Sequence, residues 1–189
     1  KEMMDRMEDS VDRLVKLLDN LLHWALQQRG HFPYVPEQLK VLDIVEEVKE
    51  MFEDMAMSKN IDITLDFEDG IVLNADKNTT SALLRNLLNN SIKFTKKGGK
   101  IHINGKRNER EQMAIIKVID NGIGMSEAKA KGLFTLKENT STKGTSGETG
   151  LGLGLQLVHD FVQLNKGNIK VQSHEGSGTT FTVYLPLAS

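Results

Sequence analysis

The spacing of apolar residues divides the chain into two parts. In the first part, apolar residues follow each other at alternating steps of four and three, which is typical of a helix in a coiled coil or bundle. A glycine and two prolines between residues 30 and 36 interrupt this pattern, because both residue types disfavour a continuing helix. The sequence therefore predicts the following order: a long helix over residues 1–30, a linker over 31–36 and a globular domain over 37–187.

The globular part alternates between helix and strand periodicity. Helices are predicted around residues 43–55, in the segment that follows Asp76, and over residues 151–164. Alternating apolar residues predict strands, mostly joined as hairpins, over residues 61–67, 71–74, 101–103, 113–119, 169–173 and 179–185. This order predicts an α+β fold, a two-layer α/β sandwich in which about three helices cover one face of a mixed sheet.

Two acidic residues are predicted to begin helices. Asp43 and Glu46 have the spacing of a capping box, and Asp76 precedes an apolar helical pattern as an N-cap residue would. The buried face of the first helix is expected to consist of Ile44, Val48, Met51, Phe52 and Met55.

Charge and composition exclude several classes of function. The 189 residues carry a formal net charge of −2, whereas a general nucleic-acid binder usually has an excess of basic residues, so we expect no nucleic-acid partner. The absence of cysteine excludes disulfides and thiolate metal sites. No apolar run approaches the roughly 20 residues of a membrane-spanning helix, so we expect no direct membrane contact by this chain.

The helix after Asp76 carries an unusual polar face. On a helix that turns about 100° per residue, Asn86, Asn89, Asn90 and Lys93 fall within one arc of roughly 100°. Such an arc is often only a solvated surface. It also suits a different task, because amide oxygens can bind Mg²⁺ and a lysine can meet phosphate oxygens.

Two glycine motifs accompany this helix. Residues 120–124 read Asp-Asn-Gly-Ile-Gly after an apolar strand, which is either an ordinary turn or the edge of a ligand pocket. Residues 150–155 read Gly-Leu-Gly-Leu-Gly-Leu and open a helix, where free backbone N–H groups and the helix dipole favour phosphate binding. Three glycines before a helix are costly for packing alone, so the second motif favours a functional role.

Together these segments resemble the N, G1, G2 and G3 boxes of sensor histidine kinases. The resemblance lies in residues 86–93, 120–124, 150–155 and 176–181, in that order, and it extends over residues 37–187. It implies the GHKL fold for ATP binding, with a lid over residues 125–149. ATP and Mg²⁺ are the implied cofactors.

The resemblance also implies roles for single residues. Asn90 would bind Mg²⁺, Asn86 would support it, and Lys93 would contact phosphate; these three form the implied catalytic set. Asp120 would accept the exocyclic amine of adenine, with Thr179 assisting through a water. The other implied ATP-binding residues are Gly122, Gly124, Gly150, Leu151, Gly152, Leu153 and Gly154. Asn89 matches no ligand position of the family and is interpreted as a helix-surface residue.

One position selects among the reactions of the family. Relatives that hydrolyse ATP or phosphorylate serine carry a Glu general base one helical turn before the magnesium-binding asparagine, and here that position is Asn86. A histidine acceptor needs no such base, because neutral imidazole already offers a lone pair. Transfer to histidine is therefore favoured. The alternatives are a GHKL ATPase, an anti-sigma-type serine kinase, or a non-catalytic nucleotide-binding module.

The acceptor histidine itself is expected to lie outside this chain. The acceptor of the family is followed by an acidic residue, a basic residue, Thr or Ser, and Pro, a context found at none of His23, His31, His102, His159 and His174. Residues 1–30 resemble the second helix of the dimerisation hairpin. The implied partners are the missing histidine helix, a second subunit in a homodimeric parent, and the receiver domain of a response regulator. The resemblance implies a cytoplasmic location for this domain. The family to which the parent protein would belong includes inner-membrane sensors.

This interpretation predicts that the chain binds Mg-ATP without labelling itself. Incubation with γ-labelled ATP and Mg²⁺ should leave no phosphohistidine on the protein, because no residue with the context of an acceptor is present. Acid-labile, base-stable label on the purified chain would contradict the assignment of the acceptor to a separate helix.

Overall fold

The computed structural model describes residues 34–134, 144–145 and 154–188. The chain divides into two units, Lys1–Tyr34 and Val35–Ser189, and the elements below belong to the second. The predicted long helix over residues 1–30 lies outside the described residues, and the domain boundaries given above remain predictions.

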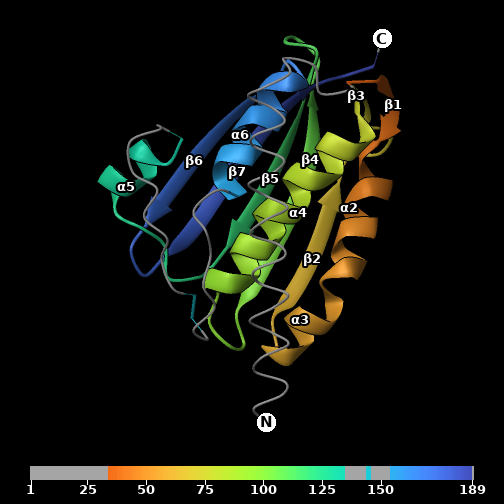
Figure 1. The fold of residues 1–189 in the computed structure, drawn as a ribbon. Helices are drawn as coiled ribbons and strands as arrows, with labels where there is room; N and C mark the ends of the chain where they lie inside the picture. The colour runs from red at the N-terminus through yellow and green to blue at the C-terminus, as the bar shows by residue number, and fades with distance from the viewer. Residues whose placement is uncertain (1–33, 135–143, 146–153, 189) are drawn as a thin grey trace, which may run out of the picture. The chain divides into compact units, whose positions relative to one another are not determined.

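Strands and helices of the second unit are labelled in Figure 1. The strands are β1 (Pro36–Lys40), β2 (Asp62–Phe67), β3 (Val72–Asp76), β4 (Lys100–Asn108), β5 (Met113–Asp120), β6 (Asn168–His174) and β7 (Gly178–Pro186). The helices are α2 (Val41–Met51), α3 (Glu53–Ser58), α4 (Lys77–Phe94), α5 (Glu127–Gly132) and α6 (Gly154–Leu164). No helix in these ranges is long and apolar enough to cross a bilayer.

A five-stranded mixed sheet forms one layer of the domain. Its strand order is β2-β4-β5-β7-β6; β2 pairs with β4 in parallel, and the other neighbours are antiparallel. Helices α2, α4 and α6 cover one face (Figure 1). The predicted α+β sandwich is confirmed.

The core lies between this sheet and α4. Every second residue of β5 is buried, in the period-2 alternation of a strand with one covered face. On α4 the buried leucines recur at helical spacing, and each contributes roughly 1.5–3 kcal/mol to stability by leaving water. The buried leucines of α4 are Leu83, Leu84, Leu87 and Leu88.

The hairpin predicted from residues 61–67 and 71–74 is wrong. Strands β2 and β3 belong to different sheets, because β3 pairs with β1 in a separate two-stranded sheet. The pattern did not predict β1, in which only Leu39 is buried. Beyond β7, Leu187 makes a bridge to Leu73 of β3, which ties the end of the large sheet to the small one.

The predicted capping box is also wrong. Helix α2 begins at Val41 with Lys40 at the N-cap and no side-chain cap, so Asp43 lies inside the first turn, where the helix dipole favours a carboxylate. The helix ends at Met51, and Met51 and Met55 are 59% and 42% exposed rather than part of the buried face. One predicted helix is thus two shorter helices, α2 and α3, and the C-terminal end of the predicted buried face is exposed to solvent.

A buried polar network joins the start of α4 to the end of α6. As predicted, Asp76 caps α4, its Oδ1 accepting from Thr79 N at 2.9 Å. Its Oδ2 accepts from Val35 N at 3.0 Å, and its own N–H donates to Asn165 Oδ1 at 2.9 Å. Asn165 is fully buried, and its Nδ2 donates to Thr79 Oγ1 and Phe161 O, both at 2.8 Å. The helices that frame the candidate site are thereby held together.

Replacing Asn165 by alanine should lower the free energy of unfolding by roughly 2–4 kcal/mol, because buried donors and acceptors at both helix ends lose their partner. Urea unfolding followed by circular dichroism measures this. Asn89→Ala is the matched control: Asn89 is exposed on α4, so its truncation should change stability by less than about 1 kcal/mol. Equal stability of the two variants would contradict a structural role for the network.

Candidate functional site

The polar face predicted on α4 is not uniformly exposed. Asn86 and Asn90 are half-buried, Asn89 is exposed, and Lys93 is buried with 9% of its surface accessible. The structure therefore separates Asn89 from the other three, which agrees with its interpretation as a surface residue. Asn86, Asn90 and Lys93 lie about one helical turn apart along α4.

Asn86 connects α4 to the start of α6. Its Nδ2 donates to Ala82 O at 2.9 Å, one turn earlier, so the amide orientation is fixed. A Cβ atom added at Gly154 would lie 2.7 Å from Asn86 Oδ1. A side chain at this position would therefore displace the Asn86 amide, so the glycine allows the present position of the amide oxygen. The predicted motifs of residues 86–93 and 150–155 therefore lie side by side here.

Asp120 lies at the end of β5, between α4 and β7. Its side chain is buried, and three donors surround it: Oδ2 accepts from Ser91 Oγ at 3.2 Å, and Oδ1 accepts from Gly122 N at 2.9 Å and Thr179 N at 3.2 Å. The Asp120 carboxylate therefore connects three of the predicted motifs, those of residues 86–93, 120–124 and 176–181.

Burial determines the acidity of this carboxylate. Desolvation raises the pKa of Asp120 above its usual value, and the hydrogen bonds from Gly122, Ser91 and Thr179 oppose that rise without cancelling it. A desolvated carboxylate that is still hydrogen-bonded on both oxygens is a candidate recognition group, because interactions with it are weakly screened.

The glycines of residues 120–124 allow close backbone packing. A Cβ at Gly122 would collide with Phe94 O at the end of α4, and a Cβ at Gly124, whose φ is +62°, would collide with His174 O. The loop after Asp120 is thereby held against both α4 and the β6–β7 turn. These packing contacts are sufficient to explain why both positions are glycine. Close approach of a ligand to this loop would be a second reason for glycine here.

Thr179 contributes through both its backbone and its side chain. Its N–H reaches Asp120, and its Oγ1 lies 2.9 Å from Ser173 Oγ, which also donates to Gly178 O and accepts from Met125 N. The sequence interpretation missed Ser91 and Ser173. Ser91 stands next to Asn90 in the asparagine motif and could have been found there, whereas no pattern signals Ser173.

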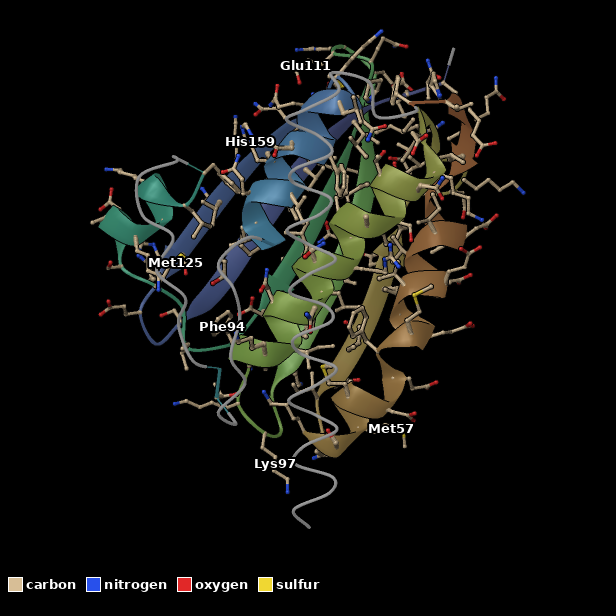
Figure 2. All side chains as sticks on the ribbon, viewed as in Figure 1. Met57, Phe94, Lys97, Glu111, Met125 and His159 are labelled. Atoms are coloured by element: carbon tan, nitrogen blue, oxygen red, sulfur yellow. The ribbon has the colours of Figure 1, made fainter. Side chains whose placement is uncertain are left out.

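The segment expected to form the lid is partly described. Helix α5 (Glu127–Gly132) lies in it and was not predicted; Ser126 Oγ caps it by accepting from Lys129 N at 3.4 Å. Phe134 then stacks on His159 of α6, with ring centroids 5.8 Å apart, and Figure 2 labels His159 on that helix. Gly150, Leu151, Gly152 and Leu153 lie outside the described residues.

The donor set fits Mg²⁺ held mainly by phosphate. In the described ranges no three His, Asp or Glu side chains converge into a metal site. The half-buried amide of Asn90 offers a hard oxygen, and Mg²⁺ usually keeps several waters and takes few protein ligands beside the phosphates of a nucleotide. A single amide oxygen is compatible with an ion that is held mainly by the phosphates of a nucleotide.

A mixed sheet covered by helices, an amide-bearing helix and a buried carboxylate at the adjacent strand end define a nucleotide-binding domain of the GHKL type. The family model described as histidine kinase-, DNA gyrase B-, and HSP90-like ATPase matches residues 75–189. The chain belongs to this family. Its relatives identify it as an ATP-binding catalytic domain of the sensor histidine kinase class.

Individual relatives support this class. The autoinducer 2 sensor kinase/phosphatase LuxQ of Vibrio cholerae is 27% identical over 182 residues, which is 94% of this chain and 21% of that protein. Full-length ShkA in complex with AMPPNP has a TM-score of 0.80 at 22% identity and covers 100% of this chain and 39% of its own. Histidine kinase ThkA, solved with response regulator protein TrrA, has a TM-score of 0.77 at 18% identity and covers 100% of this chain and 51% of its own. At these identities the two structures show the fold. The chain spans only a minor part of its curated relatives, 21% in LuxQ.

Asp120→Asn should remove a pH-dependent cost of folding. The carboxyl pKa is about 3.9 in the unfolded state and higher in the folded state, so wild-type stability falls relative to the variant as pH rises from about 4 through the folded-state pKa. The asparagine can keep the contacts, with Oδ1 accepting from both N–H groups and Nδ2 donating to Ser91.

Urea unfolding of both proteins at several pH values between 4 and 7 measures this difference. Asp66→Asn is the matched control on the exposed part of β2 and should show no such trend. A difference between wild type and Asp120→Asn that stays constant over this range would show that burial of the charge carries no folding cost.

Proposed function

We propose that this domain transfers the γ-phosphate of ATP to a histidine on a separate dimerisation helix, from which it passes to a response regulator. The observation that carries the proposal is Asn86, which stands where a general base would activate water or serine. Its Nδ2 is hydrogen-bonded to Ala82 O, and an amide cannot accept a proton at neutral pH. The domain is therefore equipped to bind and orient ATP for an acceptor that is itself a nucleophile.

Asp120 would recognise adenine. The two N–H contacts are on Oδ1, whereas Oδ2 accepts the Ser91 hydroxyl, and a carboxylate oxygen has room for two donors. That oxygen can accept the exocyclic amine of adenine. Guanine presents a carbonyl at the same position, and two acceptors would repel, so the carboxylate selects ATP over GTP.

The polar face of α4 would hold the triphosphate. We assign the Mg²⁺ contact to Asn90, support of that contact to Asn86, and phosphate contacts to Lys93 and to the glycine motif of residues 150–155. When bound, Mg²⁺ supplies charge neutralisation between the phosphates. The protein's own part is positioning: a fixed amide, a buried lysine and the N-terminus of α6.

The partners follow from the same assignment. ThkA, a structural neighbour, was solved with a response regulator protein, which supports a receiver domain as the downstream partner here. The apolar seam of residues 1–30 supports a homodimeric parent through a helix bundle. We place the domain in the cytoplasm, where ATP is available.

The test is transfer in trans. The chain is mixed with a separately expressed two-helix hairpin of the parent that carries the acceptor histidine, together with γ-labelled Mg-ATP. Label should appear on the hairpin, Asn90→Ala should reduce it at least about tenfold, and Asn89→Ala should leave it unchanged. Calorimetry with Mg-AMPPNP on the same proteins separates loss of binding from loss of transfer.

Three outcomes would contradict the proposal. Rapid release of inorganic phosphate by the wild-type chain alone would identify an ATPase. Tight binding of Mg-AMPPNP with no label on a folded hairpin would identify a non-catalytic nucleotide-binding module, and label on serine would identify a serine kinase.

A further inference from the structure

The C-terminal end of α4 is an unusually crowded junction. A helix leaves its last carbonyls without intrahelical partners, and each buried one needs a donor from elsewhere. Thr95 N closes the last helical bond, to Ser91 O at 3.0 Å. The carbonyls of Ile92, Lys93 and Phe94 then receive donors from three other parts of the chain. Figure 2 labels Phe94 at this end of the helix.

Lys59 supplies the first of these donors. It lies in the turn between α3 and β2 and is buried, with 7% of its surface accessible. Its Nζ donates to Ile92 O at 2.8 Å, to Lys93 O at 3.2 Å and to Thr145 Oγ1 at 2.7 Å. A buried ammonium is stable at this place because several oxygen acceptors surround it and because the C-terminal end of a helix dipole attracts a cation.

Thr145 supplies the second donor and links it to the first. Its N–H donates to Lys93 O at 3.0 Å. Its Oγ1 lies 3.0 Å from Lys93 O and 2.9 Å from Thr95 O, so the hydroxyl accepts from Lys59 while its hydrogen points to these carbonyls. Lys93 O is therefore contacted by Lys59 and twice by Thr145.

The loop after Asp120 supplies the third donor. Ile123 N donates to Phe94 O at 3.0 Å, and the preceding residue, Gly122, packs on the same carbonyl. The last turn of α4 thus receives bonds from Lys59, Thr145 and the Asp120 loop. The side chain of Lys93 emerges from this fixed turn, and its Nζ lies 5.1 Å from the centre of the Phe94 ring.

We propose that Lys59, acting with Thr145, is a positioning residue for nucleotide binding. It fixes the backbone of Lys93 at the end of α4, and thereby the lysine that contacts phosphate. Lys59 acts through main-chain carbonyls and does not itself touch the nucleotide. The proposal rests on the proposed function, because it assigns a role toward the phosphate contact of Lys93.

The first experiment compares Lys59→Met with Lys77→Met. Methionine keeps most of the length of lysine and removes its donors, and Lys77 is an exposed lysine at the other end of α4. Calorimetric titration with Mg-AMPPNP should show about tenfold weaker binding for Lys59→Met and less than twofold change for Lys77→Met. Circular dichroism and urea unfolding establish that each variant is folded at the temperature of the titration.

A second pair of variants tests the same junction without removing a charge. Thr145→Val removes the hydroxyl and keeps the shape, and it should weaken Mg-AMPPNP binding about threefold. Thr145→Ser keeps the hydroxyl and should restore wild-type affinity. If Lys59→Met fails to fold, the affinities of these two variants test whether the junction contributes to nucleotide binding.

A double-mutant cycle distinguishes positioning from simple stabilisation. If Lys59 acts through Lys93, Lys59→Met should have little further effect on affinity in a Lys93→Met background, while the effects on stability remain separate. Additive losses of affinity, or wild-type affinity of folded Lys59→Met and Thr145→Val, would overturn the proposal. Absence of Mg-AMPPNP binding by the wild-type chain would instead overturn the proposed function.

Discussion

Removing a carboxylate from water is the constraint around which this domain is organised. Asp120 is buried, and a buried charge is tolerated only with well-placed donors. Those donors come from three elements: the hydroxyl of Ser91 on α4, the N–H of Gly122 in the following loop and the N–H of Thr179 on β7. The pairing of β5 with β7 places Asp120 directly opposite Thr179, so the sheet register itself satisfies the charge. The same three contacts fix the relative positions of α4, the loop and the last hairpin.

Local patterns were sufficient for the elements that carry a strong period. The apolar pattern and the Asp76 cap of α4, the alternation in β5 and the pairing of the last two strands as a hairpin were predicted and are confirmed. Strand β1 gave no signal because only one of its five residues is buried. The pairing of β3 with β1 instead of β2 depends on tertiary contacts, and turn residues between two strands do not report whether those strands pair.

The residues of the candidate site also fall into those that the sequence predicted and those that depend on tertiary contacts. The motifs identified Asp120 and the amide face of α4 because their chemistry is unusual for their surroundings. Of the partners that hold Asp120, Gly122 and Thr179 lie among the predicted site residues, whereas Ser91 was missed. The partners of the last turn of α4 were not predicted. Lys59 reaches carbonyls 33 and 34 residues away in the sequence, and Thr145 lies 86 residues from Lys59. Contacts to main-chain atoms leave no signature in the identity of the residue contacted, so the supporting shell of a site is harder to predict than its ligands.

The parallel pairing of β2 with β4 has a consequence for how the domain folds. The segment between the two strands contains β3 and all of α4, so their pairing closes a long loop. The β4–β5 and β6–β7 ribbons close over short loops and lose little chain entropy on forming, whereas the crossover must close a much longer one. We therefore expect the antiparallel ribbons to assemble early and the amide-bearing helix to dock late. A newly made chain would acquire its ligand-binding surface in the final step of folding.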